Sequence, residues 1–479
     1  MGRSHRILRL FAALAVLAVV AAACGDDDGN GEAAPPDGNG DSPTTTEATV
    51  EPDRCPVDAL ADATGPVTID FWHGMTADNE DTLEDLTEAY NTSQDQVEVN
   101  LVYQGTYDET AQQFLAAARG GRLPTLVQLE ETRLQVAIDR QVMLPVESCI
   151  EASSYDTSDY LPAVLDQYTV EGQLWPMPFN TSGPVLYYNT VLFDSIGLTD
   201  NDVPSSLEEL RRVSEQVVGS GAAPYGFALE LSPWYLEQWF AMANQPLVDN
   251  DNGRAGRATT THLASETGVE LFAFIDDMVE DGLATNIGRN TSGVDALLAI
   301  ANGDVAMTFG TSAALGSILT VLESGQFEGV GVGVAPLPGP SGGGILVGGA
   351  AIWLVEDGRT DAELAAGWDY LQFLNAPEQQ ATWHAGTGYM PIRQSAIELP
   401  EVQELWDDQP FFRVAYDQLL ASEADFGGPV VGDYAGLRDA IVEGLERMLL
   451  QGATPEVVAA DVAQQAEETI GSYNRSIDR

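Results

Sequence analysis

The chain has 479 residues and a formal net charge of −54, from 74 acidic and 20 basic side chains. This acidic excess argues against a nucleic-acid-binding protein, which needs Lys and Arg to neutralise phosphates, and against docking of the protein surface on anionic lipid. The length is sufficient for two large lobes. His73, His262 and His384 do not have the spacing of metal ligands, so the sequence predicts no metal site.

The N-terminal residues predict export. Three arginines within residues 3–9 precede a short apolar stretch, residues 10–20, and three alanines lead from there to Cys24. This order is typical of a secretory signal, and the apolar stretch is too short to cross a bilayer comfortably. Cys24 resembles the cysteine of a bacterial lipobox, which is diacylated and becomes the mature N-terminus, although Ala21 stands where that motif usually has Leu. We expect a lipoprotein signal peptide at 1–23 and a lipid anchor on Cys24; the alternative is an ordinary signal peptide cut nearby.

Residues 24–60 are expected to be a disordered tether. Between 25 and 50 they are mostly Gly, Asp, Glu, Pro, Ser and Thr, with almost no apolar residue, so they cannot bury enough apolar surface to offset the entropy of ordering. If Cys24 is acylated, two cysteines remain, and an exported chain can form disulfides. We predict a disulfide between Cys55 and Cys149; the alternative is two inert buried thiols.

The first elements of the body alternate between strand and helix. The predicted segments are a strand at 67–71, a helix around 83–90, a strand at 97–103, a helix at 108–119 and a strand at 125–129. Gly120 and Gly121 stop the second helix. This alternation predicts an α/β lobe with a largely parallel sheet.

A second α/β set begins after Pro178. Its predicted strands are 185–188, 304–309, 329–335 and 350–355, and its predicted helices run through 207–213, 364–371 and 437–448. Ser205 and Glu208 have the spacing of a capping box, and residues 336–344 are expected to cross between lobes. We therefore expect two lobes with a ligand cleft between them, lobe 1 from 61–178 and 336–392, and lobe 2 from 179–335 and 393–479.

Several short segments resemble those of a known family. They are Phe71 to Met75, Gly105-Thr106-Tyr107, Pro178 to Asn189, Gly348-Gly349-Ala350, Trp383-His384 and Thr387 to Pro391. The chain resembles the extracellular solute-binding proteins of ABC importers over residues 66–475, and within them the receptors for glycerol-3-phosphate and glycerophosphodiesters. The resemblance implies a periplasmic-binding-protein-like clamp of class II type. It also implies a monomer without cofactor or catalysis, held outside the membrane and working with ABC permease subunits.

The resemblance further implies a set of ligand contacts. They are Tyr107, Glu131, Ser182, a hydroxyl at Thr311 or the adjacent Ser312, Gly349, Tyr389 and Arg438, with Trp234 nominated as an aromatic wall. An Arg fork suits phosphate oxygens, a glycine N–H lets an anion approach closely, and a carboxylate suits glycerol hydroxyls. Each residue alone has an ordinary structural role as the alternative. From the sequence we expect Arg438→Ala to abolish binding and to leave the melting of the empty protein nearly unchanged.

The acidic charge bears on the choice of ligand. A zwitterion such as glycerophosphocholine is repelled less than a free anion, and its choline can stack on an aromatic face. This favours a glycerophosphodiester over glycerol-3-phosphate. One rival function is a receptor for a neutral oligosaccharide. Another is a phosphodiesterase, for which no nucleophile-and-base pair or metal cluster is evident in the sequence.

Overall fold

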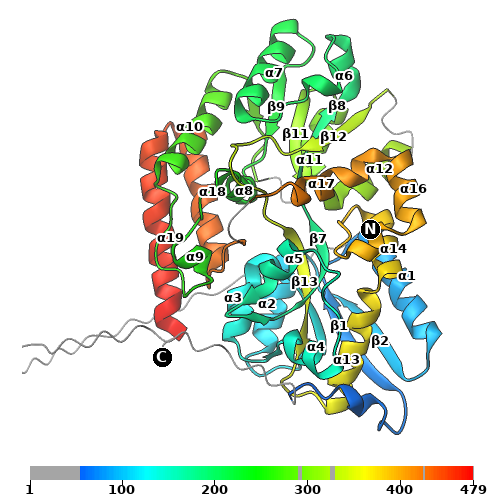
Figure 1. Ribbon diagram of the computed structural model, residues 1–479. Helices are drawn as coiled ribbons and strands as arrows, with labels where there is room; N and C mark the ends of the chain where they lie inside the picture. Colours follow the sequence, from blue (N-terminus) through cyan, green and yellow to red (C-terminus); the bar gives the residue numbers. More distant parts are fainter. Residues whose placement is uncertain (1–53, 290–293, 324–328, 424–426, 478–479) are drawn as a thin grey trace, which may run out of the picture. The chain divides into compact units, whose positions relative to one another are not determined.

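A computed structural model describes residues 54–477, except 290–293, 324–328 and 424–426. The described residues belong to one unit, Glu47–Arg479. The expected signal peptide, Cys24 and residues 24–53 of the expected tether lie outside the described residues. The last part of the expected tether, 54–60, is instead ordered: it contains the buried Cys55 and a short 3-10 helix, Val57–Leu60. Two β-sheets with helices packed against them form the two lobes (Figure 1).

The first sheet has the strand order β2-β1-β3-β13-β4, with β7 also paired to β13. Its strands are β1 (Val67–His73), β2 (Val97–Tyr103), β3 (Leu126–Glu130), β4 (Met143–Leu144), β7 (Met177–Ser182) and β13 (Gly348–Val355). The strands predicted near 67, 97, 125 and 350 are confirmed. The prediction of a largely parallel sheet is wrong in part, because β13 lies antiparallel to β3, β4 and β7.

The second sheet has the strand order β10-β9-β11-β8-β12. Its strands are β8 (Pro184–Asn189), β9 (Tyr225–Leu229), β10 (Ala284–Asn286), β11 (Val305–Thr311) and β12 (Val332–Pro336). β9 lies parallel to β10 and β11, whereas β8 lies antiparallel to β11 and β12. A separate hairpin pairs β5 (Thr169–Val170) with β6 (Gln173–Leu174).

Gly183 joins the two sheets between β7 and β8. β7 stays paired with β13 as far as Ser182, so the lobe boundary expected between residues 178 and 179 falls inside this strand. The register of the pair shifts between Ala350 and Ala351, beside Pro178, which has no N–H to donate to the ladder. The chain therefore passes directly from β7 in the first sheet to β8 in the second sheet.

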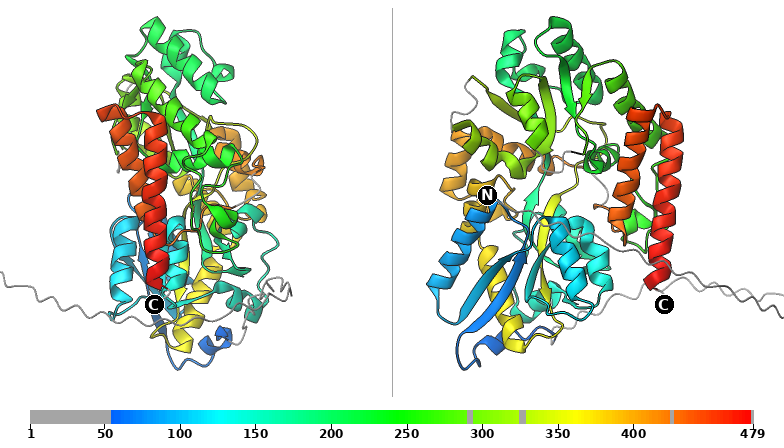
Figure 2. Two further views of the ribbon diagram at one scale, coloured as in Figure 1. Left: turned by 90° about the vertical axis from the view of Figure 1, so that its left-hand side faces the viewer. Right: turned by 180° about the vertical axis from the view of Figure 1, so that it is seen from behind.

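The helices pack on both sheets. Residues up to 182 contribute α1 (Asp78–Ser93), α2 (Tyr107–Ala117), α3 (Leu134–Asp139), α4 (Val146–Ser153) and α5 (Pro162–Tyr168). Residues 184–336 contribute α6 (Thr190–Ser195), α7 (Leu207–Ser220), α8 (Pro233–Met242), α9 (Asp249–Gly253), α10 (Glu266–Glu280), α11 (Val294–Ala301) and α12 (Leu315–Glu323). The rest of the chain contributes α13 (Asp361–Leu374), α14 (Pro377–Thr387), α15 (Gln394–Ile397), α16 (Pro400–Asp408), α17 (Val414–Leu420), α18 (Tyr434–Gln451) and α19 (Pro455–Ile477). α13 contacts β1 and α7 contacts β9, while α18 and α19 run side by side (Figure 2).

The N-terminus of α7 corrects one prediction by a single residue. Ser206, not Ser205, is the N-cap, and its side chain accepts a hydrogen bond from the backbone N–H of Glu209. The carboxylate of Glu209 accepts from both the N–H and the hydroxyl of Ser205, at 2.9 and 2.7 Å. Two adjacent serines followed by two adjacent glutamates offer two capping registers, and the helix begins in the register that Ser206 caps.

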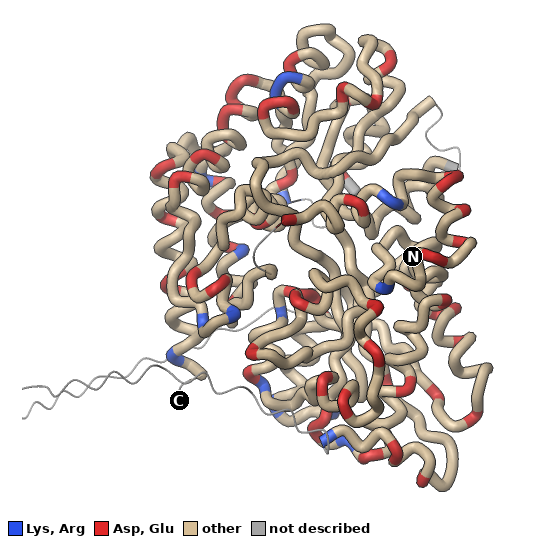
Figure 3. The backbone as a smooth tube through the Cα atoms, viewed as in Figure 1, with Lys and Arg blue, Asp and Glu red and all other residues tan. Residues whose placement is uncertain are grey.

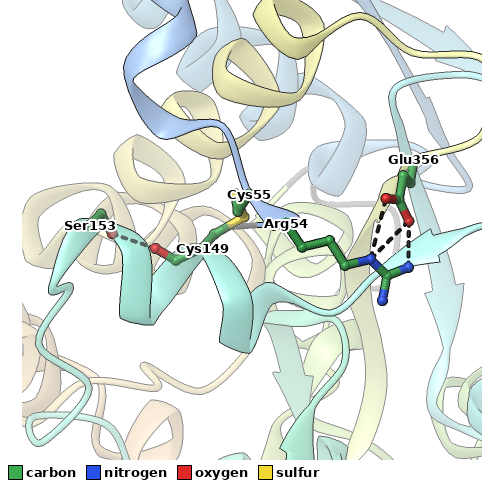
Figure 4. Close-up of a disulfide and its surroundings, with 5 residues drawn as sticks. All are labelled: Arg54, Cys55, Cys149, Ser153 and Glu356. Carbon is green, nitrogen blue, oxygen red and sulfur yellow. Dashed lines mark hydrogen bonds and ion pairs between the residues drawn. A yellow bond between two sulfur atoms is a disulfide. The ribbon is translucent and has the colours of Figure 1, made fainter. Parts of the chain in front are cut away.

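A disulfide joins Cys55 to Cys149, with the two Cα atoms 5.0 Å apart (Figure 4). These are the two cysteines paired in the sequence prediction. The adjacent Arg54 makes an ion pair with Glu356, on the loop that follows β13. The hydroxyl of Ser153 donates to the carbonyl oxygen of Cys149 at 2.6 Å. The start of the body is therefore fastened to α4 and to the end of β13.

Acidic residues lie along both lobes, and basic residues are few (Figure 3). Within the described ranges, no helix is both long and apolar enough to cross a bilayer. The same residues include no group of three or more His, Cys, Asp or Glu that could hold a metal ion.

Candidate functional site

A cavity of about 410 Å³ is lined by residues from both sheets and from α18. Eight of the nine ligand contacts expected from the sequence line it: Tyr107, Glu131, Ser182, Trp234, Thr311, Gly349, Tyr389 and Arg438. The ninth, Ser312, does not. Folding thus gathers widely separated residues around one space, which makes this cavity the candidate site.

Tyr107 is placed at the cavity by the first turn of α2. Thr106 is the N-cap: its hydroxyl accepts from the N–H of Glu109 at 3.3 Å, and the Glu109 carboxylate accepts from the N–H of Thr106 at 2.8 Å. This reciprocal capping box fixes the helix start. A Cβ at Gly74 would lie 3.2 Å from Cδ1 of Tyr107, so a glycine there leaves room for the ring.

A chain of hydrogen bonds orients the two tyrosine hydroxyls. The N–H of Gly74 donates to Gln128 at 3.0 Å, the Gln128 amide donates to Asn180 at 2.8 Å, and the Asn180 amide donates to the Tyr107 hydroxyl at 2.8 Å. The hydroxyls of Tyr107 and Tyr389 lie 2.9 Å apart. Burial raises the pKa of both tyrosines, so both remain neutral. Because Tyr107 already accepts from Asn180, its proton can be donated to Tyr389 or to a ligand.

His384 fixes the backbone of Tyr389. Its Nδ1 lies 2.6 Å from the Tyr389 carbonyl oxygen, and its Nε2 accepts from the indole N–H of Trp406 at 2.8 Å. An indole N–H can only donate, so Nε2 carries no proton and Nδ1–H donates to Tyr389. Burial lowers the pKa of His384 to about 4, and the imidazole is therefore neutral at neutral pH.

Acidification is expected to destabilise the fold through His384. Its pKa is about 4 in the folded protein and ordinarily 6.5, so the unfolded chain takes up a proton at this histidine more readily than the folded protein does. The contribution of the neutral His384 to the unfolding free energy is therefore complete above pH 6.5 and is lost as the pH falls toward 4. A shift of this size corresponds to about 3 kcal/mol of unfolding free energy. Urea unfolding of the wild type and of His384→Asn at several pH values checks this. The variant should have a lower unfolding free energy at pH 7 than the wild type, but lose less of it on acidification. An equal loss of unfolding free energy in both proteins would show that His384 does not cause the acid sensitivity.

Two adjacent glycines shape one wall. A Cβ at Gly348 would lie 2.7 Å from Cζ2 of Trp234, and a Cβ at Gly349 would lie 2.1 Å from the carbonyl oxygen of Asn180. Gly349 also has a φ of +102°, which residues with a side chain rarely adopt. Gly348 therefore makes room for the Trp234 ring, and Gly349 lets β13 and β7 approach at the cavity.

Trp234, and not Trp239, faces the cavity. Trp239 is 2% exposed, and its indole N–H donates to the carbonyl oxygen of Pro338 at 2.9 Å. Trp234 lies in the first turn of α8 beside Tyr235, with ring centroids 5.5 Å apart. Tyr235 and Phe309 also line the cavity, so the aromatic wall is broader than the sequence indicated.

Thr311 and Ser312 differ in position and in hydrogen bonding. The hydroxyl of Ser312 accepts from the N–H of Gly183 at 3.2 Å, and the N–H of Ser312 donates to the carbonyl oxygen of Gly183 at 2.9 Å. Ser312 therefore fastens the end of β11 to Gly183 and does not line the cavity. Thr311 lines the cavity, and its carbonyl oxygen accepts from the hydroxyl of Tyr187 at 2.8 Å.

Arg438, on α18, is surrounded by three carboxylates. Its Nε and Nη2 donate to the two oxygens of Glu237 at 2.9 and 2.7 Å. Its Nη1 lies 3.7 Å from Glu130, and its Nη2 lies 3.6 Å from Glu131. Burial lowers the pKa of Arg438, but the charges of Glu237 and Glu130 outweigh it and raise the pKa well above its ordinary value. The guanidinium is therefore charged, and one of its two-donor edges is occupied.

Glu131 is the most buried of the carboxyls that line the cavity. Its Oε2 is buried and has no hydrogen-bond partner among the described residues. Burial and the charge of Glu130 raise the pKa of Glu131 well above its ordinary value, although Arg438 lowers it. A protonated Glu131 can donate one hydrogen bond as well as accept others, so its chemistry is broader than the acceptor expected from the sequence.

Sequence reasoning missed several residues of this site. One of them, Glu237, pairs with Arg438 but does not line the cavity. The others line it: Glu130, Tyr187, Glu230, Ser232, Tyr235 and Phe309. A signal for Glu237 was present, because it stands in α8 between Leu236 and Trp239, both of which are buried. A carboxylate inside an apolar stretch requires a buried partner.

A second cavity, of about 340 Å³, also contains an arginine but is a weaker candidate. All five N–H groups of Arg254 donate to backbone carbonyl oxygens, those of Asp166, Gln167, Thr169 and Gly428, at 2.8 to 3.2 Å. The carbonyls of Asp166 and Gln167 belong to the last turn of α5. Arg254 therefore caps that helix and has no donor left for a ligand.

Comparison with known proteins gives the chain its relatives. A family model described as bacterial extracellular solute-binding protein matches residues 85–409. The chain is 28% identical over 389 residues to the sn-glycerol-3-phosphate-binding periplasmic protein UgpB of Brucella abortus (strain 2308). The aligned region covers 79% of this chain and 87% of the relative. It is 27% identical over 426 residues to the protein of the same name from Yersinia pestis, covering 87% and 95%.

Solved structures share the fold. UgpB from Mycobacterium tuberculosis in complex with glycerophosphocholine has a TM-score of 0.69 and 23% identity, covering 86% of this chain and 100% of that one. The GacH receptor of Streptomyces glaucescens, solved unliganded and with acarbose, has a TM-score of 0.70 and 21% identity, covering 85% and 99%. At these identities the likeness establishes the two-lobed α/β clamp.

Proposed function

Because the chain belongs to the bacterial extracellular solute-binding proteins, we propose that it captures one small solute and delivers it to the membrane subunits of an ABC importer. The solute we propose is a glycerophosphodiester such as glycerophosphocholine, with sn-glycerol-3-phosphate as the related ligand. The names of the relatives support this choice. The observation that carries it is the convergence of Arg438, the Tyr107–Tyr389 hydroxyl pair and Trp234 on one cavity.

Each part of such a ligand has a chemical counterpart in the cavity. Arg438 is charged and would attract the phosphate, while Tyr107 and Tyr389 offer neutral hydroxyls. Glu131 would hold glycerol hydroxyls. The cationic choline would lie against an aromatic face such as that of Trp234, where cation–π attraction contributes about 0.5–2 kcal/mol.

The other expectations complete the proposal. The chain would be a monomeric binding protein rather than an enzyme, without cofactor, anchored by lipid on Cys24 to the outer face of the cell membrane. Lobe 1 would comprise 61–178 and 336–392, and lobe 2 would comprise 179–335 and 393–479, with β7 finishing the first lobe at Ser182.

A thermal-shift panel tests the ligand class. Glycerophosphocholine at about 100 times its dissociation constant should add about 2.7 kcal/mol to the unfolding free energy and raise the melting temperature by several degrees. Maltose at the same concentration should leave it unchanged. Incubation with the protein should release no free choline; release would identify a phosphodiesterase.

A receptor for a neutral oligosaccharide is the second candidate. It is favoured by the presence of the carboxylates Glu130 and Glu230 and the aromatic rings of Trp234 and Tyr235 in the lining of one cavity, since sugars offer hydroxyl donors and apolar ring faces. A rise in melting temperature with maltose, and none with glycerophosphocholine, would establish this function in place of the proposed one.

A further inference from the structure

Arg438 presents a partly occupied fork to the cavity. An arginine that binds phosphate well uses two parallel N–H groups. Here the Nε–Nη2 edge is taken by Glu237, at 2.9 and 2.7 Å, and the Glu237 side chain is only 2% exposed. Three N–H groups remain: two on Nη1, which lies 3.7 Å from Glu130, and one on Nη2, which lies 3.6 Å from Glu131. A ligand phosphate thus meets an arginine whose charge is already largely balanced.

The charge around Arg438 distinguishes two classes of phosphate. One positive charge faces the carboxyls of Glu130, Glu131 and Glu237, so the cluster stays formally negative even when Glu131 carries a proton. A phosphomonoester carries a charge of about −1.5 to −2 at pH 7. A phosphodiester carries a single negative charge, so the surplus carboxylate charge that offsets the attraction of Arg438 opposes its binding roughly half as strongly.

We propose that Glu237 is a specificity-determining residue. It binds the Nε–Nη2 edge of Arg438 and so makes the site favour phosphodiester monoanions over phosphomonoester dianions. This inference rests on the proposed function and names the substrate class within it. Glu237 does not line the main cavity, so it acts through Arg438 and is a positioning residue.

The test compares Glu237→Gln with a matched control. Gln keeps the shape and can still accept from Arg438, but it removes the charge. The control is Glu446→Gln, because Glu446 makes the same two-bond pair with an arginine, Arg289, at 2.7 and 3.0 Å. Glu446 lies on α18, the helix of Arg438, and does not line the cavity. Both variants change the net charge equally, so a difference between their ligand affinities reports the location of the removed charge.

Calorimetry with glycerol-3-phosphate and glycerophosphocholine at one pH and salt concentration gives the readout. In Glu237→Gln the ratio of the two dissociation constants should shift about tenfold toward glycerol-3-phosphate, and in Glu446→Gln it should remain that of the wild type. A folded Glu237→Gln whose ratio stays within about twofold of the wild type overturns the inference alone. A wild type that binds neither ligand overturns the proposed function, and the inference with it.

A second variant keeps the inference testable if Glu237→Gln does not fold. Glu130 lies 3.7 Å from Nη1 and its side chain is 23% exposed, so Glu130→Gln removes a charge from the same cluster with less structural cost. Its ratio should move in the same direction by about threefold. If Glu130→Gln has the same ratio of dissociation constants as the wild type, the inference is overturned.

Discussion

Replacing Arg438 with Ala is expected to weaken binding of glycerophosphocholine by about 100-fold or more, because it removes the cation that would face the phosphate. It is also expected to destabilise the empty protein. Glu237 is 3% exposed and would be left as a buried carboxylate without its partner. Loss of one partner of a buried ion pair costs about 3–5 kcal/mol. The ion pair thus corrects the expectation, drawn from sequence, of a nearly unchanged melting curve.

A double variant separates binding from stability. Arg438→Gln with Glu237→Gln replaces the ion pair by two neutral amides, so no charge is left buried and unpaired. The double variant should melt closer to the wild type than Arg438→Ala does, yet bind glycerophosphocholine no better than Arg438→Ala. Differential scanning calorimetry and titration calorimetry give the two quantities. Wild-type affinity in the double variant would assign Arg438 a purely structural role.

Removal of the Cys55–Cys149 disulfide should lower the unfolding free energy by about 4 kcal/mol. The bridge closes a loop with a sequence separation of 94, and a loop of that length restricts the unfolded chain strongly. Neither cysteine lines the candidate site, so affinity for the ligand should be unchanged. Denaturant unfolding of Cys55→Ser with Cys149→Ser, next to the wild type, measures the loss.

Alkylation provides the control for that experiment. The denatured, unreduced protein should take up no alkyl group at Cys55 or Cys149, and two groups after reduction. Two groups added without reduction would show free thiols. An unchanged unfolding free energy in the double serine variant would show that the bridge contributes nothing to stability.

The fold was largely predictable where the pattern of apolar residues is regular. β2 alternates in its side chains and occupies the predicted residues 97–103, and α18 contains the predicted helical positions Leu437, Ile441, Leu445 and Met448. The strand β7 was missed because Pro178 and Asn180 are poor strand formers. It forms because β13 pairs with it, and such pairing depends on residues far apart in the chain.

The candidate site was predictable only through resemblance. Tyr107, Tyr389 and Arg438 come from α2, the loop after α14 and α18, and no local pattern brings them together. Glu237 escaped because its partner is 201 residues away and the carboxylate looked like one of many in an acidic chain. The roles of Ser312 and Gly349 depend on close backbone contacts that sequence spacing does not report.

Titration calorimetry of the wild-type protein with glycerophosphocholine and with glycerol-3-phosphate tests the central claim most directly. The cavity, with one charged arginine among carboxyls and an aromatic wall, predicts one ligand per chain and tighter binding of the diester. Tight binding of glycerol-3-phosphate with no heat from glycerophosphocholine would contradict it.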